Sequence, residues 1–239
     1  MLFSQQTLDF LVQNRLRNSR DWYLAHKNEY QMFVLAPMTA LVERLTPAML
    51  AIDPCFITIP KVNKTISRLH RDTRFSKDKS LYRDAVWCQF SRDKKTQACL
   101  LGYYFEVTPR HFSYGCGFFE ADTKTMQVLR EMIAADDRLF REALAAYQNQ
   151  SALVLQGEFY KKSRYPGQPE PKRQWLDRKG IWLSHTSGDF DLLFSEDLAP
   201  RLAHDFTQAG PVYHLFQRAL ERTRAQTGLY RQRQTAQEE

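Results

Sequence analysis

The chain is short of the features that mark membrane, secreted and linker-rich proteins. Only 9 of its 239 residues are glycine, which argues against long flexible linkers. No apolar run approaches the roughly 20 residues that a membrane-spanning helix needs. The first six residues lack the basic and apolar regions of a secretory signal. We therefore expect a cytoplasmic protein without a membrane partner.

Motifs for metal, redox and phosphate chemistry are also absent from the sequence. The four cysteines, at positions 55, 88, 99 and 116, form no Cys-x-x-Cys pair, and none has a histidine at metal-ligand spacing. Three lie in apolar, strand-like runs, so we expect reduced, structural cysteines and no metal site. Gly-x-Ser-x-Gly, His-Glu-x-x-His, Walker A and calcium-loop patterns are missing, which argues against the common hydrolase, zincin and P-loop classes. The cofactor, if any, stays unknown.

What the sequence does contain is one dense basic stretch, Arg68–Tyr82, called the basic loop below. Arginine presents a planar fork of donors that matches phosphate or carboxylate, and lysine adds a point charge. Because so many like charges repel one another, holding them together costs stability unless an anion binds. The side chains that could form an anion site are Arg68, Arg71, Arg74, Lys77, Lys79, Asp72, Asp78, Ser76 and Tyr82.

These side chains suggest separate roles within the basic loop. The five cations would bind the anion, with Ser76 and Tyr82 adding hydrogen bonds. Asp72 and Asp78 would order the loop through Asx-type turns, or one of them would act as a base. The alternative is a solvated basic face whose aspartates make local salt bridges. His70, the histidine inside the stretch, has Asp72 as its one evident partner for proton transfer.

Three residues outside the basic loop complete the candidate ligand site. Gly115 and Gly117 lie in a strand-like segment, where a missing side chain lets another group come close. That group is either a neighbouring part of the protein or, in a functional interpretation, the ligand or the basic loop. Lys161 follows another strand-like run and is the third residue.

Hydrophobic periodicity predicts a single α+β domain over residues 1–221, followed by a tail or frayed helix at 222–239. Helical spacing marks residues 4–50, with Trp22, Tyr30 and Phe33 on the buried face of a helix from Asp21 and an end or kink at Pro47. Period-2 alternation predicts an antiparallel meander at 86–91, 99–107 and 112–118, with a hairpin loop at 92–97. Further strands are expected at 56–59 and 153–159, and helices at 123–149, 174–179, 198–206 and from 211.

The basic loop also resembles the signature of a known family. The pattern Arg68-x-x-Arg71-Asp72-Thr73-Arg74-Phe75-Ser76-Lys77-Asp78-Lys79-Ser80-x-Tyr82 is similar to that of the uncharacterised domain-of-unknown-function family 2461. The likeness runs over residues 3–220 and implies a shared site without naming its chemistry. The chain departs from the family pattern after Tyr160-Lys161, where Glu170-Pro171 stands in place of a His-Pro pair. Further matching stretches are Asn18-x-Arg20-Asp21-Trp22-Tyr23 with Lys27 and Tyr30, Gly102-Tyr103-Tyr104, Gly115-Cys116-Gly117 and Leu129-Arg130-x-x-Ile133.

Three functions are compatible with these patterns, and a net charge of +7 favours anionic partners in general. The first hypothesis is a site for an anionic small molecule, phosphorylated or carboxylated, with or without catalysis. The second is nucleic-acid binding through the basic loop together with C-terminal arginines. The third is a protein-interaction module without chemistry. The arginines of the second hypothesis are Arg222, Arg224, Arg231 and Arg233.

Overall fold

The computed structural model describes residues 1–93 and 99–238, with side chains described as far as Thr227. Residues 94–97 of the expected hairpin loop lie outside the described residues. The chain forms two compact units whose segments alternate in sequence. The α+β class is confirmed. The sequence alone predicts a single domain over residues 1–221, and the contacts divide between unit 1 (Met1–Phe90, Tyr103–Gly115, His185–Thr207) and unit 2 (Ser91–Gly102, Cys116–Ser184, Gln208–Glu239).

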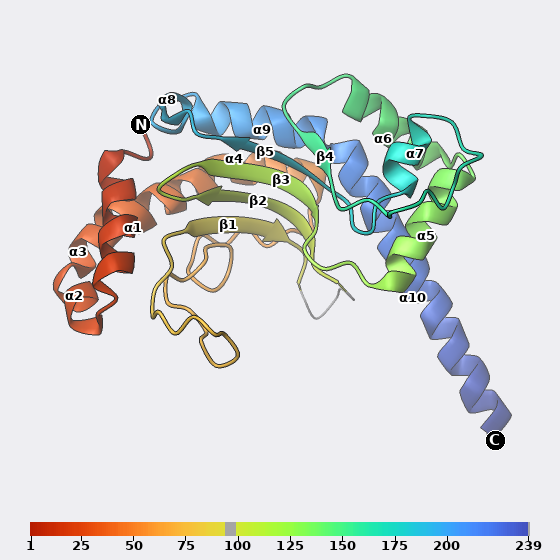
Figure 1. Cartoon of the computed structure of the whole chain (residues 1–239), viewed down its shortest axis with the longest axis horizontal. Helices are drawn as coiled ribbons and strands as arrows, with labels where there is room; N and C mark the ends of the chain where they lie inside the picture. The colour runs from red at the N-terminus through yellow and green to blue at the C-terminus, as the bar shows by residue number, and fades with distance from the viewer. Residues whose placement is uncertain (94–98, 239) are drawn as a thin grey trace. The chain divides into compact units, whose positions relative to one another are not determined.

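The strands of the described chain form a five-stranded sheet in the order β1-β2-β3-β5-β4 (Figure 1). The predicted meander is confirmed as β1 (Val86–Ser91), β2 (Leu101–Val107) and β3 (Phe112–Phe118), with β2 between its neighbours. The short strand β4 (Val154–Gln156) pairs antiparallel with β5 (Trp182–Ser187). The strand expected at 153–159 therefore ends earlier than its apolar pattern suggests.

One face of β2 carries the core of unit 1. Tyr103 and Phe105 are fully buried. Phe3 packs on Phe105 with ring centres 5.8 Å apart, and Phe206 packs on Tyr103 at 5.1 Å. Phe206 belongs to α9 (Leu198–Gln208), which follows the short helix α8 (Phe190–Leu193). Aromatic contacts therefore fix the chain start and α9 against the same strand.

A buried carboxylate also ties α9 to β3. The Tyr114 hydroxyl donates to Oδ2 of Asp205 at 2.6 Å, and Nε of Arg201 donates to the same oxygen at 2.8 Å. Asp205 is 4% exposed, so both donors replace water that burial removes. Burial and the Asp205 carboxylate raise the pKa of Tyr114, so this hydroxyl stays a hydrogen-bond donor.

The N-terminal helices differ from the sequence prediction after Arg17. The first helix, α1 (Gln5–Arg17), ends at Asn18 in the left-handed conformation, with φ 46°. The single helix predicted from Asp21 is wrong, because the backbone leaves helical geometry at His26 (φ −105°, ψ 21°). Trp22 is consequently only partly buried. In place of one helix there are α2 (Arg20–Ala25), α3 (Lys27–Glu29) and the π-helix η1 (Tyr30–Leu35).

The next helix, α4 (Ala36–Ile52), continues directly from η1 and contains Pro47 without ending there. Of the end or kink expected at Pro47, the end is wrong, because burial of the inner face outweighs the lost backbone bond. Leu41, Leu45 and Met49 on that face are fully buried in unit 1. By length and composition alone the helical run Lys27–Ile52 could cross a membrane. One third of its most apolar window is buried in the fold.

Residues 53–85 contain no helix and no regular strand, so the strand expected at 56–59 is wrong. Phe56 instead packs edge-on against Tyr103 at 6.0 Å. Farther along, residues 65–71 run antiparallel to residues 81–89, through Arg71 N–H to Leu81 O at 2.8 Å and Gln89 N–H to Thr65 O at 2.8 Å. The basic loop is thus the tip of an irregular hairpin whose second arm continues into β1.

Unit 2 contains the remaining helices. The helix predicted over 123–149 is two helices, because Asp136 adopts a left-handed conformation (φ 55°) and Asp137 caps a new start by accepting the Leu139 N–H. Arg130 fastens the unit internally by donating to the carbonyl oxygens of Leu176, Arg178 and Lys179. The helices are α5 (Thr123–Ala134), α6 (Arg138–Gln148), α7 (Lys172–Leu176) and α10 (Gly210–Glu238).

Asn14 in α1 provides a test of this packing. Its side chain is fully buried, and neither its nitrogen nor its oxygen has a hydrogen-bond partner among the described residues. Leu has the same branched shape without polar atoms. Asn14→Leu should therefore raise the free energy of unfolding by about 1–3 kcal/mol, measured by urea denaturation.

Asn18 is the matched control at the end of the same helix. Its Oδ1 accepts the Leu81 N–H at 2.6 Å, and its φ is positive. Asn18→Leu should therefore lower the free energy of unfolding by a similar amount. A loss of stability in Asn14→Leu would show that its amide has a partner that the packing argument misses.

Candidate functional site

The basic loop is ordered by its own carboxylates. Asp72 Oδ1 accepts the Arg74 N–H and Asp78 Oδ1 accepts the Ser80 N–H, which confirms both expected Asx-type turns. Asp72 also binds the Arg74 guanidinium through both oxygens, at 3.0 and 2.7 Å. Arg71 donates to Asp78 and to Ser76. The forks of Arg71 and Arg74 are therefore occupied within the loop.

Helix α1 holds the second arm of the loop. Arg15 donates to the Tyr82 carbonyl oxygen at 3.0 Å and to Asp78 Oδ2 at 2.9 Å, and Asn18 accepts the Leu81 N–H. Hydrogen bonds from Ser80 first, then from Arg15 and Arg71, hold the pKa of Asp78 well below its usual range. This carboxylate thus joins the loop to α1 as long as it is ionised.

Behind the loop, unit 1 has a groove of about 560 Å³, called the tyrosine groove. Its walls come from α2, η1, the segment 62–70 and the end of the basic loop. A volume of this size is typical of sites for metabolite-sized ligands. The lining residues are Arg20, Tyr23, Leu24, Tyr30, Gln31, Leu35, Val62, Arg68, Leu69, His70, Leu81 and Tyr82.

Three tyrosines form one wall of this groove. Tyr23 stacks on Tyr82 with ring centres 5.1 Å apart, and Tyr30 lies 5.6 Å from Tyr23. Burial raises the pKa of all three phenols, to about 12 for Tyr30. They therefore remain neutral at physiological pH and can donate hydrogen bonds. Tyr30 and Leu35 are placed here by the π-helix, a geometry that often occurs at functional sites.

The charge of the tyrosine groove is positive. Arg20 and Arg68 line it, together with His70, and none of the twelve lining residues is acidic. Among the described residues, neither guanidinium makes a hydrogen bond or an ion pair. Nearby, Arg83 donates to the Arg68 carbonyl oxygen at 3.2 Å and lies over the Trp87 ring at 4.7 Å. Burial, and after it the charges of Arg68 and Arg71, lower the pKa of Arg83, while the Glu106 carboxylate acts in the opposite direction.

The residues that the sequence singled out fall into three groups in the structure: those that line the tyrosine groove, those that bind one another within the basic loop, and those that lie elsewhere. Arg68 and Tyr82 line the tyrosine groove, and His70 lies beside them. Lys77 is exposed, while Lys79 donates to the Thr73 carbonyl oxygen. The residues used inside the loop are Arg71, Asp72, Arg74, Ser76 and Asp78. Those not brought to the groove are Gly115 and Gly117 of β3 and Lys161, an exposed residue of unit 2.

Position 117 has no room for a side chain, because the neighbouring strand β5 lies too close. A Cβ atom at this position would lie 2.4 Å from Cβ and 2.7 Å from Cα of Trp182 in β5. Real Cβ atoms do not approach other atoms so closely. The interpretation of Gly117 as a packing residue is therefore the one that the geometry supports, and the close neighbour is Trp182.

Of the twelve residues that line the groove, sequence reasoning singled out three, Arg68, His70 and Tyr82, and missed nine. It assigned no ligand role to Arg20, Tyr23 or Tyr30, although these residues belong to the N-terminal stretch that resembles the family motif. That stretch was the available signal. Its meaning depends on a contact between residues far apart in sequence, such as the Tyr23–Tyr82 stack.

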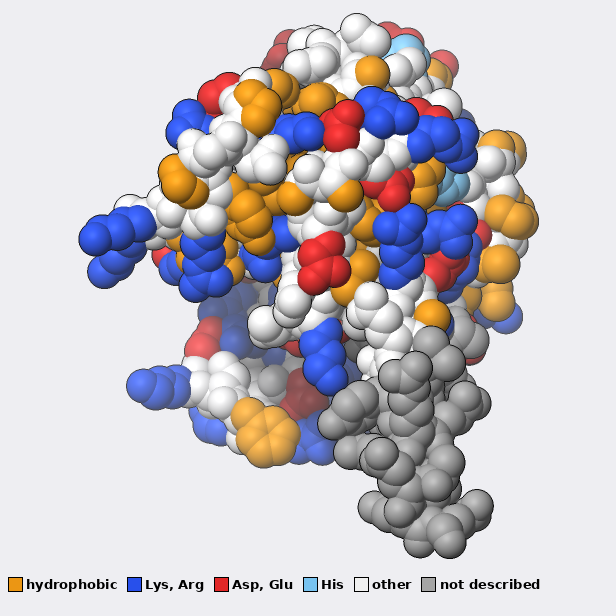
Figure 2. All heavy atoms as spheres, turned by 90° about the vertical axis from the view of Figure 1, so that its right-hand side faces the viewer, with side chains coloured by type: hydrophobic (Ala, Val, Ile, Leu, Met, Phe, Trp, Pro, Cys, Tyr) orange, Lys and Arg blue, Asp and Glu red, His pale blue; other side chains and the backbone are white. Residues whose placement is uncertain are grey.

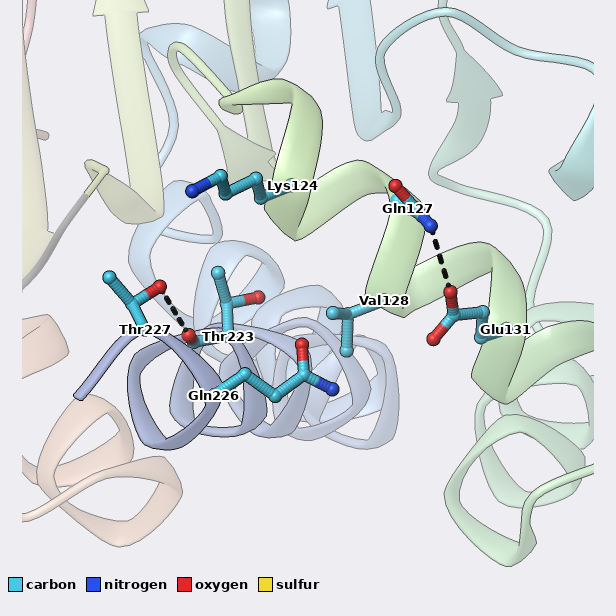
Figure 3. Close-up of a pocket in the computed structure, with 7 residues that line it drawn as sticks. All are labelled: Lys124, Gln127, Val128, Glu131, Thr223, Gln226 and Thr227. Carbon is cyan, nitrogen blue, oxygen red and sulfur yellow. Dashed lines mark hydrogen bonds between the residues drawn. The ribbon is translucent and has the colours of Figure 1, made fainter. Parts of the chain in front are cut away.

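Other surfaces have weaker claims to be a site. In unit 2, a hollow of about 230 Å³ between α5 and α10 is lined by Lys124 and Glu131 of opposite charge and by polar side chains (Figure 3). Lys and Arg side chains are spread over the face seen in Figure 2, where acidic and apolar side chains separate them. No group of three or more His, Cys, Asp and Glu side chains in the described ranges could hold a metal ion.

Acid should release the loop from α1. Because the pKa of Asp78 is lower in the folded state, the stabilisation it provides is present above the ordinary pKa near ~3.9 and is lost as pH falls through the folded value. Hydrogen exchange should show the Leu81 amide losing protection in that range. In the Asp78→Asn variant, the Leu81 amide should lose this protection already at neutral pH. Asp72→Asn is the control, since Asp72 binds only its neighbour Arg74 and should leave Leu81 protected.

The packing role of Gly117 predicts a large effect of a single methyl group. Gly117→Ala should lower the free energy of unfolding by about 3 kcal/mol, because backbone atoms of β5 must move. Gly167→Ala is the matched control, since a Cβ there would meet nothing within 4 Å. Equal stability of the two variants, measured by chemical denaturation, would refute the close approach.

Comparison with known proteins agrees with the motifs. The sequence matches the family described as conserved hypothetical protein, DUF2461, over residues 6–215. This range contains all residues of the basic loop and of the tyrosine groove. No curated protein matches the chain. Because the match spans most of the 239 residues, the resemblance seen in the sequence is confirmed, and the chain belongs to the DUF2461 family.

Proposed function

We propose that the protein binds a small anionic molecule, phosphorylated or carboxylated, in the tyrosine groove. The observation that carries this proposal is the groove's lining, which combines Arg20, Arg68 and His70 with three tyrosines and contains no acidic residue. An anion entering it meets positive charge that no carboxylate of the lining offsets.

The state of the arginines supports this choice of site within the basic region. Arg71 and Arg74 already bind Asp78 and Asp72, so an anion would have to displace a carboxylate to reach them. The guanidiniums of Arg68 and Arg20 have no such competitor among the described residues. Their planar forks can accept two oxygens of a phosphate or carboxylate at once.

The remaining lining residues indicate what the non-anionic part of the ligand is like. Leu24, Leu35, Val62 and Leu81 are apolar, and the stacked pair of Tyr23 and Tyr82 offers a flat aromatic surface. Neutral phenols can donate to an anion or to a hydroxyl group. The ligand best suited to the groove is an anionic headgroup attached to a partly apolar or planar body.

A second candidate function, binding of single-stranded nucleic acid, is favoured by one observation. Phe75 at the loop tip is 95% exposed, with the Arg74 guanidinium 5.8 Å from its ring centre. Exposed aromatic rings beside cations can stack on bases. The C-terminal part of this hypothesis has less support, because Arg222 binds Asp137, and Arg231 and Arg233 lie outside the residues whose side chains are described.

A cytoplasmic location is part of the same proposal. Its support is the four free cysteines, Cys55, Cys88, Cys99 and Cys116, since proteins of oxidising compartments usually pair theirs. The small-molecule function requires no membrane partner.

A thermal-shift panel tests the proposed function. At constant ionic strength, phosphate, sulfate or a phosphorylated metabolite at about a hundred times its Kd should stabilise the protein by ~2.7 kcal/mol, a rise in Tm of about 5–10 °C. Arg68→Ala and Arg20→Ala should each lose most of this shift, because each removes one unpaired fork.

Arg74→Ala is the matched control, since it removes the same charge from the same loop but from a fork that Asp72 occupies. It should keep the anion-induced shift. Nucleic-acid binding should instead weaken steeply with salt and depend on Phe75 and Arg74. A wild-type protein that no small anion stabilises, and that binds single-stranded DNA or RNA through Phe75, would replace the first function by the second.

A further inference from the structure

His70 has a defined tautomer in the tyrosine groove. Its Nδ1 lies 2.9 Å from the Arg71 carbonyl oxygen. A carbonyl oxygen can only accept a hydrogen bond, so Nδ1 must carry the proton. In the neutral ring the lone pair therefore resides on Nε2, the nitrogen used by nucleophilic and basic histidines. The side chain is exposed, and its ring meets the Tyr82 ring edge-on at 5.6 Å.

We propose that His70 Nε2 is a nucleophile that accepts a phosphoryl group from the ligand bound in the tyrosine groove. This inference rests on the proposed function, because it requires the anion to be held by Arg20 and Arg68 beside His70. It narrows the ligand from anions in general to phosphorylated molecules that can donate a phosphoryl group to His70.

The bonds of the step balance with an acyl phosphate as donor. The Nε2 lone pair forms the new N–P bond, and the bond between phosphorus and the leaving oxygen breaks with its electron pair. For acetyl phosphate the leaving group is acetate, which needs no proton at neutral pH. Positive charge then develops on the imidazole ring, and the Nδ1–H bond to the Arg71 carbonyl oxygen stabilises it.

The groove supplies the other requirements of such a transfer. The charge of a transferring phosphoryl group is stabilised by arginine forks, and positioning provides most of the catalysis. Arg20 and Arg68 line the same groove as His70 and remain unpaired among the described residues. No residue of the lining is acidic, so the carboxylate charge that acts on Arg68 comes from outside the groove, from Asp72.

A second histidine, His26, has the same hydrogen bond from Nδ1 to a carbonyl oxygen but lacks the surroundings that the proposed nucleophile needs. Its Nδ1 lies 2.8 Å from the Trp22 carbonyl oxygen, so it has the same tautomer as His70. Its ring stacks on Trp22 at 4.1 Å, and the hollow it lines contains Asp9 and Glu29 together with Arg17. Two carboxylates against one arginine leave this lining with a net negative charge, so His26 is a control with the same ring chemistry in a less favourable setting for a phosphate.

The test is phosphorylation of the full-length protein by acetyl phosphate. We expect wild type to gain the mass of one phosphoryl group, in an acid-labile and base-stable linkage that peptide mass spectrometry places on His70 and phosphorus NMR identifies as N–P. His70→Gln should gain none, and His26→Gln should label like wild type. Arg68→Ala should label about a hundredfold more slowly.

Binding of inorganic phosphate, followed by thermal shift, separates the two levels of the argument. If phosphate stabilises wild type and His70→Gln alike but acetyl phosphate never labels His70, the nucleophile inference is wrong and the binding function stands. If phosphate has no effect and no label forms, the proposed function itself is wrong. Labelling that persists in His70→Gln, or that falls equally in His26→Gln, would also overturn the role of His70.

Discussion

The tyrosine groove depends on how residues 53–85 satisfy their backbone hydrogen-bonding groups without a helix or strand of their own. Buried backbone groups must find partners. Residues 65–71 pair with residues 81–89, and α1 completes the ladder through Arg15 and Asn18. This pairing sets His70 opposite Tyr82. The groove is thus positioned by backbone bonds, and its charged side chains are free to meet a ligand.

Only some of the arginines of the basic loop are paired with carboxylates. Its two aspartates bind Arg71 and Arg74 and shape the turns at the tip, while Arg68 keeps an unpaired guanidinium on the groove side. Burial of Arg83 beside Arg68 concentrates positive charge there. Self-repulsion of this kind destabilises a fold unless an anion offsets it. The proposed site therefore differs from the rest of the basic loop in that the guanidinium of its arginine, Arg68, makes no hydrogen bond or ion pair among the described residues, whereas those of Arg71 and Arg74 do.

Aromatic packing makes the groove rigid before any ligand arrives. A chain of rings runs from Phe10 through Tyr30 and Tyr23 to Tyr82 and His70. Tyr30 is the first residue of the π-helix η1, whose extra residue per turn changes the direction of the side chains that follow it. Side chains held by stacking lose little further entropy on binding, so more of the contact energy contributes to affinity.

Local pattern by itself determined the meander, the Asx turns of the basic loop and its excess of cations, because each depends on neighbouring residues or on a fixed period. Tertiary structure decided the rest. The missing strand at 56–59, where Phe56 packs on Tyr103, and the role of Gly117 beside Trp182 both depend on distant contacts. So does the groove, because Arg20, Tyr23 and Tyr30 lie far from His70 in sequence, and only long-range backbone pairing and burial bring them to one wall.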